Sequence, residues 1–259
     1  MRTIAVANQK GGCSKTSTVV NLGAALGERG YKILVVDLDP QANATYWLGG
    51  PASSRSALKF LSDNEAIPVI EKTSAKGVFV VAGSSELSNY HEYVTDVYVA
   101  GTILTENLYK LKANWDFVLL DTPPTLGLIT QCVLSAAGEL LVPVAMQTLS
   151  LEGVVKIINK TREMRENNNT KIEILGLLAT RFDSRTNHSK EVIKLLTDYF
   201  GSQVFDTVIR ENIRLAEAPS FKQSILSYAS KSKASADFRA LATEVITRID
   251  ANRDQYEVN

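Results

Sequence analysis

A short segment near the N-terminus carries the residue types that hold phosphate. Its sequence, KGGCSKTS, begins at Lys10 and ends at Ser17. Glycines let backbone N–H groups surround phosphate oxygens, and a helix that begins there adds a favourable dipole. Lys15 can bring its charge to the β- and γ-phosphates of a nucleotide, and the Thr16 hydroxyl can bind Mg²⁺. We therefore predict a phosphate loop made of Lys10, Gly11, Gly12, Cys13, Ser14, Lys15, Thr16 and Ser17.

Two residues distinguish this segment from an ordinary phosphate loop. Lys10 precedes the glycine pair, where an ordinary loop needs no cation. Ser14 stands where a glycine would be usual, and its Cβ disfavours a positive φ. The loop must therefore either avoid that conformation at Ser14 or bear some strain.

Three aspartates follow apolar runs and form a second candidate group. Asp37 ends the run KILVVD, and Asp39 comes two residues later, on the same side of the chain if the strand continues. Asp121 ends the run FVLLD. Open α/β sheets bind ligands at the carboxyl ends of their strands, so these side chains are candidates for metal and water binding. The alternative is that they cap the turns that follow the strands.

Apolar runs that alternate with helical patterns position these residues. We expect strands at Thr3–Asn8, Lys32–Asp37, Val78–Ala82, Phe117–Asp121, Leu140–Val144 and Ile172–Thr180. Helices are expected at about Lys15–Gly30, Ala100–Ala113, Leu128–Ala137, Leu151–Asn167, Lys190–Tyr199 and Ala234–Ile249. This alternation predicts an α/β fold, a P-loop domain with a mostly parallel twisted sheet and helices on both faces. Gly49–Ser56 is expected to be a loop, and nothing marks a domain boundary, so 1–259 is predicted to be a single domain.

Composition excludes several classes of protein. The 259 residues have a formal net charge of zero and a pI of about 6.8, so any nucleic-acid binding must come from a local patch. No apolar run approaches the roughly 18 residues that would cross a bilayer. Two cysteines are too few for a disulfide framework, which favours a cytoplasmic protein.

The loop KGGCSKTS resembles the signature-lysine loop of the ParA/Soj/MinD ATPases, KGGxGKTT. The resemblance continues in family order over essentially the whole chain and is specific to the small Soj-like ParA branch, which lacks an N-terminal helix-turn-helix domain. Its other blocks are VDLDPQANAT from Val36, DTPP from Asp121, LEG from Leu151, DSRTN from Asp183 and NIRLAEAPS from Asn212.

The resemblance implies ATP and Mg²⁺ as cofactors and a sandwich homodimer in the ATP-bound state. By this analogy Lys10 reaches the nucleotide of the partner subunit, and Asp39 positions or activates the attacking water. Asp37 lies nearer the metal, and Asp121 holds Mg²⁺ through water, together with Thr16. Asn212 matches the residue that contacts adenine. The proline that usually stands two positions earlier is Arg210 here.

The resemblance also implies non-specific DNA binding. Arg185 and Arg214 match the blocks that carry the DNA-binding arginines of Soj-like proteins. No acidic residue occurs between Glu217 and Asp237, whereas Lys222, Lys231 and Lys233 do. Arg185, Arg214 and Lys222 are the predicted DNA-binding residues. On charge alone, an ordinary solvated surface would be the simpler interpretation.

The predicted function is ATP-dependent partitioning of plasmid or chromosome DNA. A ParB-like or adaptor protein would stimulate hydrolysis, and the protein would be nucleoid-associated in the cytoplasm. The main alternative is positioning of a protein cargo, such as a carboxysome or a chemosensory array. A MinD-like membrane-cycling role is weaker, because the polar segment 250–259 has no apolar face, and no membrane partner is expected.

Two further alternatives fit poorly. An iron–sulfur reductase would need two suitably placed cysteines in each chain, but Cys13 lies in the phosphate loop, which leaves Cys132 alone. Cys132 is more simply a helix residue beside the core. A switch that binds nucleotide but scarcely hydrolyses it is supported only by Ser14.

Overall fold

One seven-stranded sheet forms the centre of the molecule. The computed structural model describes residues 1–51, 56–147, 151–168 and 170–257. In these residues the strand order is β3-β4-β2-β5-β1-β6-β7. Neighbouring strands run parallel except at the β3–β4 edge. The strands are β1 (Arg2–Val6), β2 (Ile33–Asp37), β3 (Ile70–Lys72), β4 (Val78–Val81), β5 (Phe117–Asp121), β6 (Glu139–Ala145) and β7 (Glu173–Thr180). The predicted α/β class with a mostly parallel sheet is confirmed.

The central strands are apolar along their whole length because both faces of the sheet are covered. Every residue of β2, β5 and β6 is buried. Successive residues of β2 belong to different apolar clusters, with Leu34 and Val36 in one and Ile33 and Val35 in the other. This alternation follows from the two-residue period of a strand.

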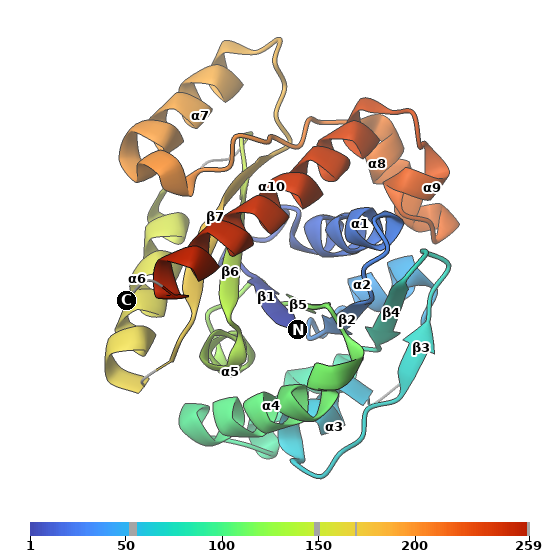
Figure 1. Cartoon of the computed structure of the whole chain (residues 1–259), viewed down its shortest axis with the longest axis vertical. Coiled ribbons are helices and arrows are strands. Elements are labelled where there is room, and N and C mark those ends of the chain that lie inside the picture. The colour runs from blue at the N-terminus through green and yellow to red at the C-terminus, as the bar shows by residue number, and fades with distance from the viewer. Residues whose placement is uncertain (52–55, 148–150, 169, 258–259) are drawn as a thin grey trace.

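Helices cover the two faces separately (Figure 1). One face packs against α1 (Lys15–Glu28), α2 (Asn43–Leu48), α9 (Ile225–Tyr228) and α10 (Lys233–Glu257). The other face packs against α3 (Ser56–Ser62), α4 (Val97–Leu111), α5 (Leu128–Ala136), α6 (Leu151–Asn168) and α7 (Asn187–Phe200).

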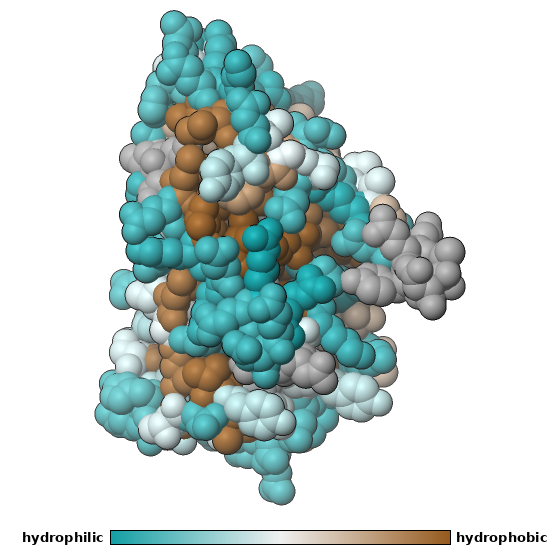
Figure 2. Space-filling view, turned by 90° about the vertical axis from the view of Figure 1, so that its left-hand side faces the viewer, coloured by the Kyte–Doolittle hydropathy of each residue, from teal (hydrophilic) through white to brown (hydrophobic). Residues whose placement is uncertain are grey.

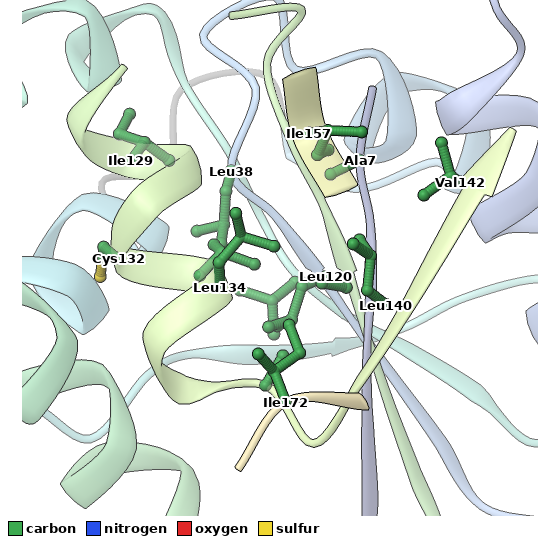
Figure 3. Packing of buried hydrophobic residues seen from close by; sticks show 14 of the residues in the cluster. Ala7, Leu38, Leu120, Ile129, Cys132, Leu134, Leu140, Val142, Ile157 and Ile172 are labelled. Carbon is green, nitrogen blue, oxygen red and sulfur yellow. The ribbon is translucent and has the colours of Figure 1, made fainter. Parts of the chain in front are cut away.

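Figure 3 shows from close by the apolar cluster on the face that carries α3, α4, α5, α6 and α7. Leu134 of α5 and Ile157 of α6 come together with Leu120 of β5 and Leu140 of β6. Cys132 lies on the side of α5 that faces away from these strands, and its thiol donates to the carbonyl oxygen of Ala100 in α4 at 3.1 Å. Cys132 is therefore a buried helix residue, as predicted.

The short elements were not expected from the sequence. These are α2, α3, β3, α9, α8 (Ile213–Glu217), and 3₁₀ helices that include η1 (Ser85–Glu92) and η4 (Ala218–Phe221). Elements this short carry too little periodicity to be recognised. The last helix also runs to Glu257, beyond the predicted end at Ile249. Of the predicted Gly49–Ser56 loop, residues 52–55 lie outside the described residues, and α3 begins at Ser56.

The face that carries α6 and α7 is mostly polar, with apolar atoms visible in a band between the polar side chains (Figure 2). Within the part of the chain that the structure describes, every helix is too short or too polar to cross a membrane.

Candidate nucleotide site

The predicted phosphate loop connects β1 to the start of α1, as the sequence indicates. Hydrogen bonds fix it to the neighbouring strands. Asn8 donates its side-chain amide to the carbonyl oxygen of Pro143 in β6 at 2.7 Å and accepts the backbone N–H of Lys10 at 3.2 Å. The hydroxyl of Thr180, at the end of β7, donates to the carbonyl oxygen of Cys13 at 3.2 Å. These hydrogen bonds hold the loop between β1, β6 and β7.

Ser14 bears the strain that its sequence position predicts. Its φ of 71° and ψ of 28° are left-handed, and its side chain makes no capping hydrogen bond to α1. A left-handed conformation costs a residue with a Cβ about 1–2 kcal/mol. Gly12 has a similar φ of 73°, but as a glycine it adopts this conformation without that cost.

Lys15 and Thr16 open α1 at the mouth of the loop. Lys15 is 7% exposed, and its ammonium lies 3.4 Å from the carbonyl oxygen of Lys10. The Thr16 hydroxyl donates to Asp121 Oδ2 at 2.8 Å. The structure thus brings together a hydroxyl and a carboxylate that are 105 positions apart in the chain.

Asp37 and Asp121 are register partners on adjacent strands, and both are fully buried. Burial, and then the charge of Asp37, raises the pKa of Asp121 well above its usual value. Asp121 Oδ1 has no hydrogen-bond partner among the described residues. A buried carboxylate oxygen without a partner, beside a second carboxylate and a threonine hydroxyl, suits a hard divalent cation such as Mg²⁺.

Asp37 is more heavily engaged by protein groups than Asp121. Its Oδ2 accepts the backbone N–H and the hydroxyl of Thr45, each at 2.7 Å, and its Oδ1 accepts the N–H of Asp39 at 3.3 Å. Burial raises the pKa of Asp37 to about 6. These contacts tie the end of β2 to α2, so Asp37 fixes the position of α2.

Asp39 and the phosphate loop line a hollow of about 480 Å³, which we call the phosphate-loop hollow. Asp39 is 7% exposed, and its Oδ1 accepts the N–H of Gln41 at 2.9 Å. The other residues that line this hollow are Gly11, Gly12, Ser14, Lys15, Thr16, Ser17, Gln41, Asn43, Tyr46, Trp47, Pro124, Arg181 and Pro219. The hollow therefore gathers most of the predicted phosphate, metal and water ligands.

A second hollow, of about 760 Å³, which we call the arginine hollow, is lined by cationic side chains and also by Asp183 and Glu211. Arg185 and Arg214, distant in sequence, both line it, with Arg210 and Lys233. Arg185 pairs with Asp183 at 2.8 Å, and Arg214 pairs with Glu217 at 3.1 Å. These exposed pairs contribute little to stability, so the arginines can exchange their partners for an anionic ligand.

Lys222 and Asn212 lie outside the phosphate-loop hollow, and their predicted roles stay predictions. Lys222 lies apart from the arginine hollow, with its ammonium 5.5 Å from the ring centre of Tyr46 in α2. Asn212 lines the arginine hollow rather than the phosphate-loop hollow. Its Oδ1 caps α8 by accepting the N–H of Arg214 at 2.9 Å.

The two cysteines are both buried, and burial raises the pKa of each thiol. No group of three or more His, Cys, Asp or Glu side chains with metal-binding geometry occurs within the described ranges. The Cys13 thiol donates to the carbonyl oxygen of Lys10 at 3.0 Å and so belongs to the loop structure.

Several site residues escaped the sequence interpretation. Arg181 and Pro219 line the phosphate-loop hollow. The Trp47 indole N–H donates to the carbonyl oxygen of Gln223 at 2.6 Å. Arg210, noted only as a missing proline, pairs with Asp237. Most of these contacts join residues that are far apart in the sequence, and no local motif predicts them.

Comparison with known proteins places the chain in a family. A family model described as an AAA domain matches residues 1–174. Soj of Bacillus subtilis, a sporulation initiation inhibitor protein, is 35% identical over 247 residues, which are 94% of this chain and 98% of Soj. The chromosome partitioning protein ParA of Caulobacter vibrioides is 35% identical over 254 residues, covering 96% of this chain and 95% of ParA.

A solved structure agrees with these relatives. Cobyrinic acid a,c-diamide synthase from Mycobacterium smegmatis, solved with ADP and magnesium, is 31% identical and gives a TM-score of 0.77 over 89% of this chain and 96% of its own. The family model covers more than half of the chain and both relatives are 35% identical over nearly all of it, so the chain belongs to the ParA/MinD family of ATPases.

Proposed function

We propose that this chain is a Mg²⁺-dependent ATP hydrolase that drives DNA partitioning. The observation that carries the proposal is the contact between the Thr16 hydroxyl and Asp121 Oδ2 at 2.8 Å, beside the phosphate loop and Asp39. The names of the relatives support it, since they include a chromosome partitioning protein and a chromosome-partitioning ATPase.

Thr16 and Asp121 would hold Mg²⁺, because the hydroxyl and the unpartnered carboxylate oxygen are ligands that this ion prefers. The ion supplies charge neutralisation to the nucleotide phosphates. Asp37 was predicted to lie nearer the metal, and this stays a prediction. Its three accepted hydrogen bonds support a different role, which is to hold α2 in register with the site.

The remaining residues position the reactants. Lys15 binds the β- and γ-phosphates with its ammonium, while the loop N–H groups hold the phosphate oxygens. Asp39 orients the attacking water with its carboxylate at the edge of the same hollow. No covalent intermediate is needed, because positioning and charge stabilisation supply the catalysis. Lys10 completes the site of a second copy in the ATP-bound dimer.

DNA would bind at the arginine hollow. Arg185 and Arg214 are exposed there beside Lys233, although the chain as a whole has no net charge. Contacts from these side chains to phosphates carry no sequence information, which suits binding anywhere on a nucleoid. A ParB-like or adaptor protein would then accelerate hydrolysis and release the DNA.

Retention of plasmid DNA of arbitrary sequence on a filter tests this proposal. With ATP and Mg²⁺, the wild-type protein should retain DNA, and with ADP it should not. Arg214→Ala should lower retention severalfold and flatten its dependence on salt, because one phosphate contact is lost. Arg162→Ala, which removes an exposed arginine of α6, is the matched control and should retain DNA normally.

Retention that is equal with ATP and ADP would contradict nucleotide-gated DNA binding. An ATP-dependent dimer that retains no DNA would favour a protein cargo instead.

A further inference from the structure

Arg181 lies in the phosphate-loop hollow, and the proposed function gives this residue no role. It follows β7 directly and lines the phosphate-loop hollow with Gly12, Lys15 and Ser17. Its φ of 52° is left-handed. Such a conformation is uncommon in a residue that carries a Cβ, and it persists where surrounding structure enforces it.

Hydrogen bonds on both sides of Arg181 enforce this backbone conformation. The carbonyl oxygen of Thr180 accepts the N–H of Met146 at 2.9 Å, and the Thr180 hydroxyl holds the phosphate loop. On the other side, Phe182 donates its N–H to the carbonyl oxygen of Ile209 at 3.1 Å. Arg181 is therefore held at a fixed place relative to the phosphate loop.

Strand order shows which part of a nucleotide Arg181 faces. The phosphate loop follows β1, and the carboxylates of Asp37 and Asp121 lie on β2 and β5, on one side of it. Arg181 follows β7, two strands away on the other side, about 10 Å from β1 at ordinary strand spacing. Since the metal end of the nucleotide lies toward the carboxylates, the nucleoside end extends toward β6 and β7.

Arg181 lies between the two hollows, and this position agrees with a nucleoside that extends toward β6 and β7. Arg181 lines the phosphate-loop hollow, whereas the next residue, Phe182, lines the arginine hollow. A nucleoside that leads from one hollow toward the other must pass Arg181.

The guanidinium of Arg181 is available for a ligand. It is exposed, and it makes no hydrogen bond or ion pair with the residues that the structure describes. The neighbouring arginines differ, since Arg185, Arg210 and Arg214 each pair with a carboxylate. A planar guanidinium packs well on an aromatic face.

We infer that Arg181 stacks its guanidinium on the base of the bound nucleotide and so sets nucleotide affinity from the nucleoside side. The inference rests on the proposed ATP site and adds a residue to it. A stacked guanidinium interacts with the base in both ATP and ADP, so it strengthens the binding of both by the same factor. It contributes nothing to a ligand that has phosphates but no base.

Calorimetric titration of the whole chain with Mg²⁺ and three ligands tests the inference. Arg181→Met should weaken ATP and ADP alike, roughly 5- to 30-fold, a range that runs from an exposed to a desolvated cation–π contact. Inorganic tripolyphosphate should bind the variant within about twofold of wild type. Arg181→Lys should recover little of the loss, because an ammonium keeps the charge but not the plane.

Methionine and lysine carry a Cβ as arginine does, so these variants leave the backbone strain unchanged. Arg162→Met is the matched control and should bind all three ligands as wild type does. Three results would overturn the inference: unchanged ATP affinity, an equal loss for tripolyphosphate, or full recovery by Arg181→Lys. Failure of the wild-type protein itself to bind ATP would instead refute the proposed function.

Discussion

At the scale of single residues, Ser14 shows how the phosphate loop departs from its usual form. Its left-handed backbone, at φ 71°, is one that glycine would adopt without a steric cost. Ser14→Gly should therefore raise the free energy of unfolding by about 0.5–1 kcal/mol, part of the relieved strain being offset by the greater freedom of glycine in the unfolded chain. Urea denaturation measures this change.

Ser14→Ala separates the strain from the hydroxyl. Alanine keeps the Cβ and removes only the oxygen, which makes no capping hydrogen bond. Its free energy of unfolding should match that of wild type. A gain in stability with alanine as large as that with glycine would show that Ser14 is not strained.

Glu139, at the start of β6, makes stability depend on pH. It is 7% exposed, and Arg2 approaches it only to 3.4 Å. Burial raises the pKa of Glu139 from 4.5 to about 7. Between these values the unfolded chain has released the proton and the folded chain retains it. The free energy of unfolding therefore falls as pH rises from about 4.5 to about 7.

Glu139→Gln should remove this pH dependence. At pH 8 the variant should be more stable than wild type by on the order of 2–3 kcal/mol, and near pH 4.5 the two should converge. Urea denaturation at both pH values provides the measurement. If the difference in the free energy of unfolding between Glu139→Gln and wild type stayed constant across this pH range, Glu139 would be ionised in the folded protein at all of these pH values.

Residue types and spacing predict the phosphate loop, Asp39 and Asp121 because each follows a recognisable apolar run. The partners of these residues are harder to predict. The contact of Thr16 with Asp121 can be expected from strand order, but Arg181 and the link from Trp47 to Gln223 depend on where distant segments meet. No local pattern in the sequence encodes such contacts.

At the scale of elements, α2 connects the nucleotide site to the basic segment that follows α8. Thr45 of α2 donates to Asp37, Trp47 donates to the carbonyl oxygen of Gln223, and Tyr46 lies beneath the ammonium of Lys222. These contacts form a continuous path between the end of β2 and Lys222. Movement of α2 between nucleotide states would therefore shift Lys222.

Trp47→Phe tests this path by removing the indole N–H and keeping an aromatic ring. The ratio of DNA retention with ATP to retention with ADP should fall by about threefold or more, since one buried hydrogen bond is worth about 0.5–1.5 kcal/mol. ATP affinity is measured separately, because Trp47 also lines the phosphate-loop hollow and its substitution can change nucleotide binding itself. Filter retention and calorimetry measure the two quantities.

Trp115→Phe is the matched control, because its indole N–H is buried without a hydrogen-bond partner among the described residues. That variant should leave the ATP-to-ADP ratio unchanged. Equal effects of the two tryptophan substitutions would mean that α2 does not transmit the nucleotide state.

The long elements are predictable, and the short ones are not. Apolar runs mark six strands, β1, β2, β4, β5, β6 and β7. The long helices show a 3.6-residue period. In contrast, α2 has six residues and begins after Ala42, whose φ of 50° is left-handed. Its position is set by hydrogen bonds from Thr45 to Asp37 rather than by its own periodicity.

At the scale of the whole molecule, the predicted site residues lie at or after the carboxyl ends of strands in one sheet. The strands run from residue 2 to residue 180, and the helices up to α10 pack on its two faces (Figure 1). This arrangement is compatible with a single domain over 1–259, which stays a prediction. It also leaves the phosphate loop and Lys10 at the carboxyl ends of the strands, where the second copy of the proposed dimer would meet them.

The site around Thr16, Asp39 and Asp121 is expected to hydrolyse ATP. Single-turnover release of phosphate measures this reaction in wild type and in Asp39→Asn, which preserves the shape of the side chain and removes its charge. Wild type should release phosphate slowly and only with Mg²⁺. Asp39→Asn should bind ATP within about threefold of wild type but release phosphate at least about 100-fold more slowly. Release at the wild-type rate by Asp39→Asn, or release without Mg²⁺, would show that these residues do not hydrolyse ATP in the way proposed.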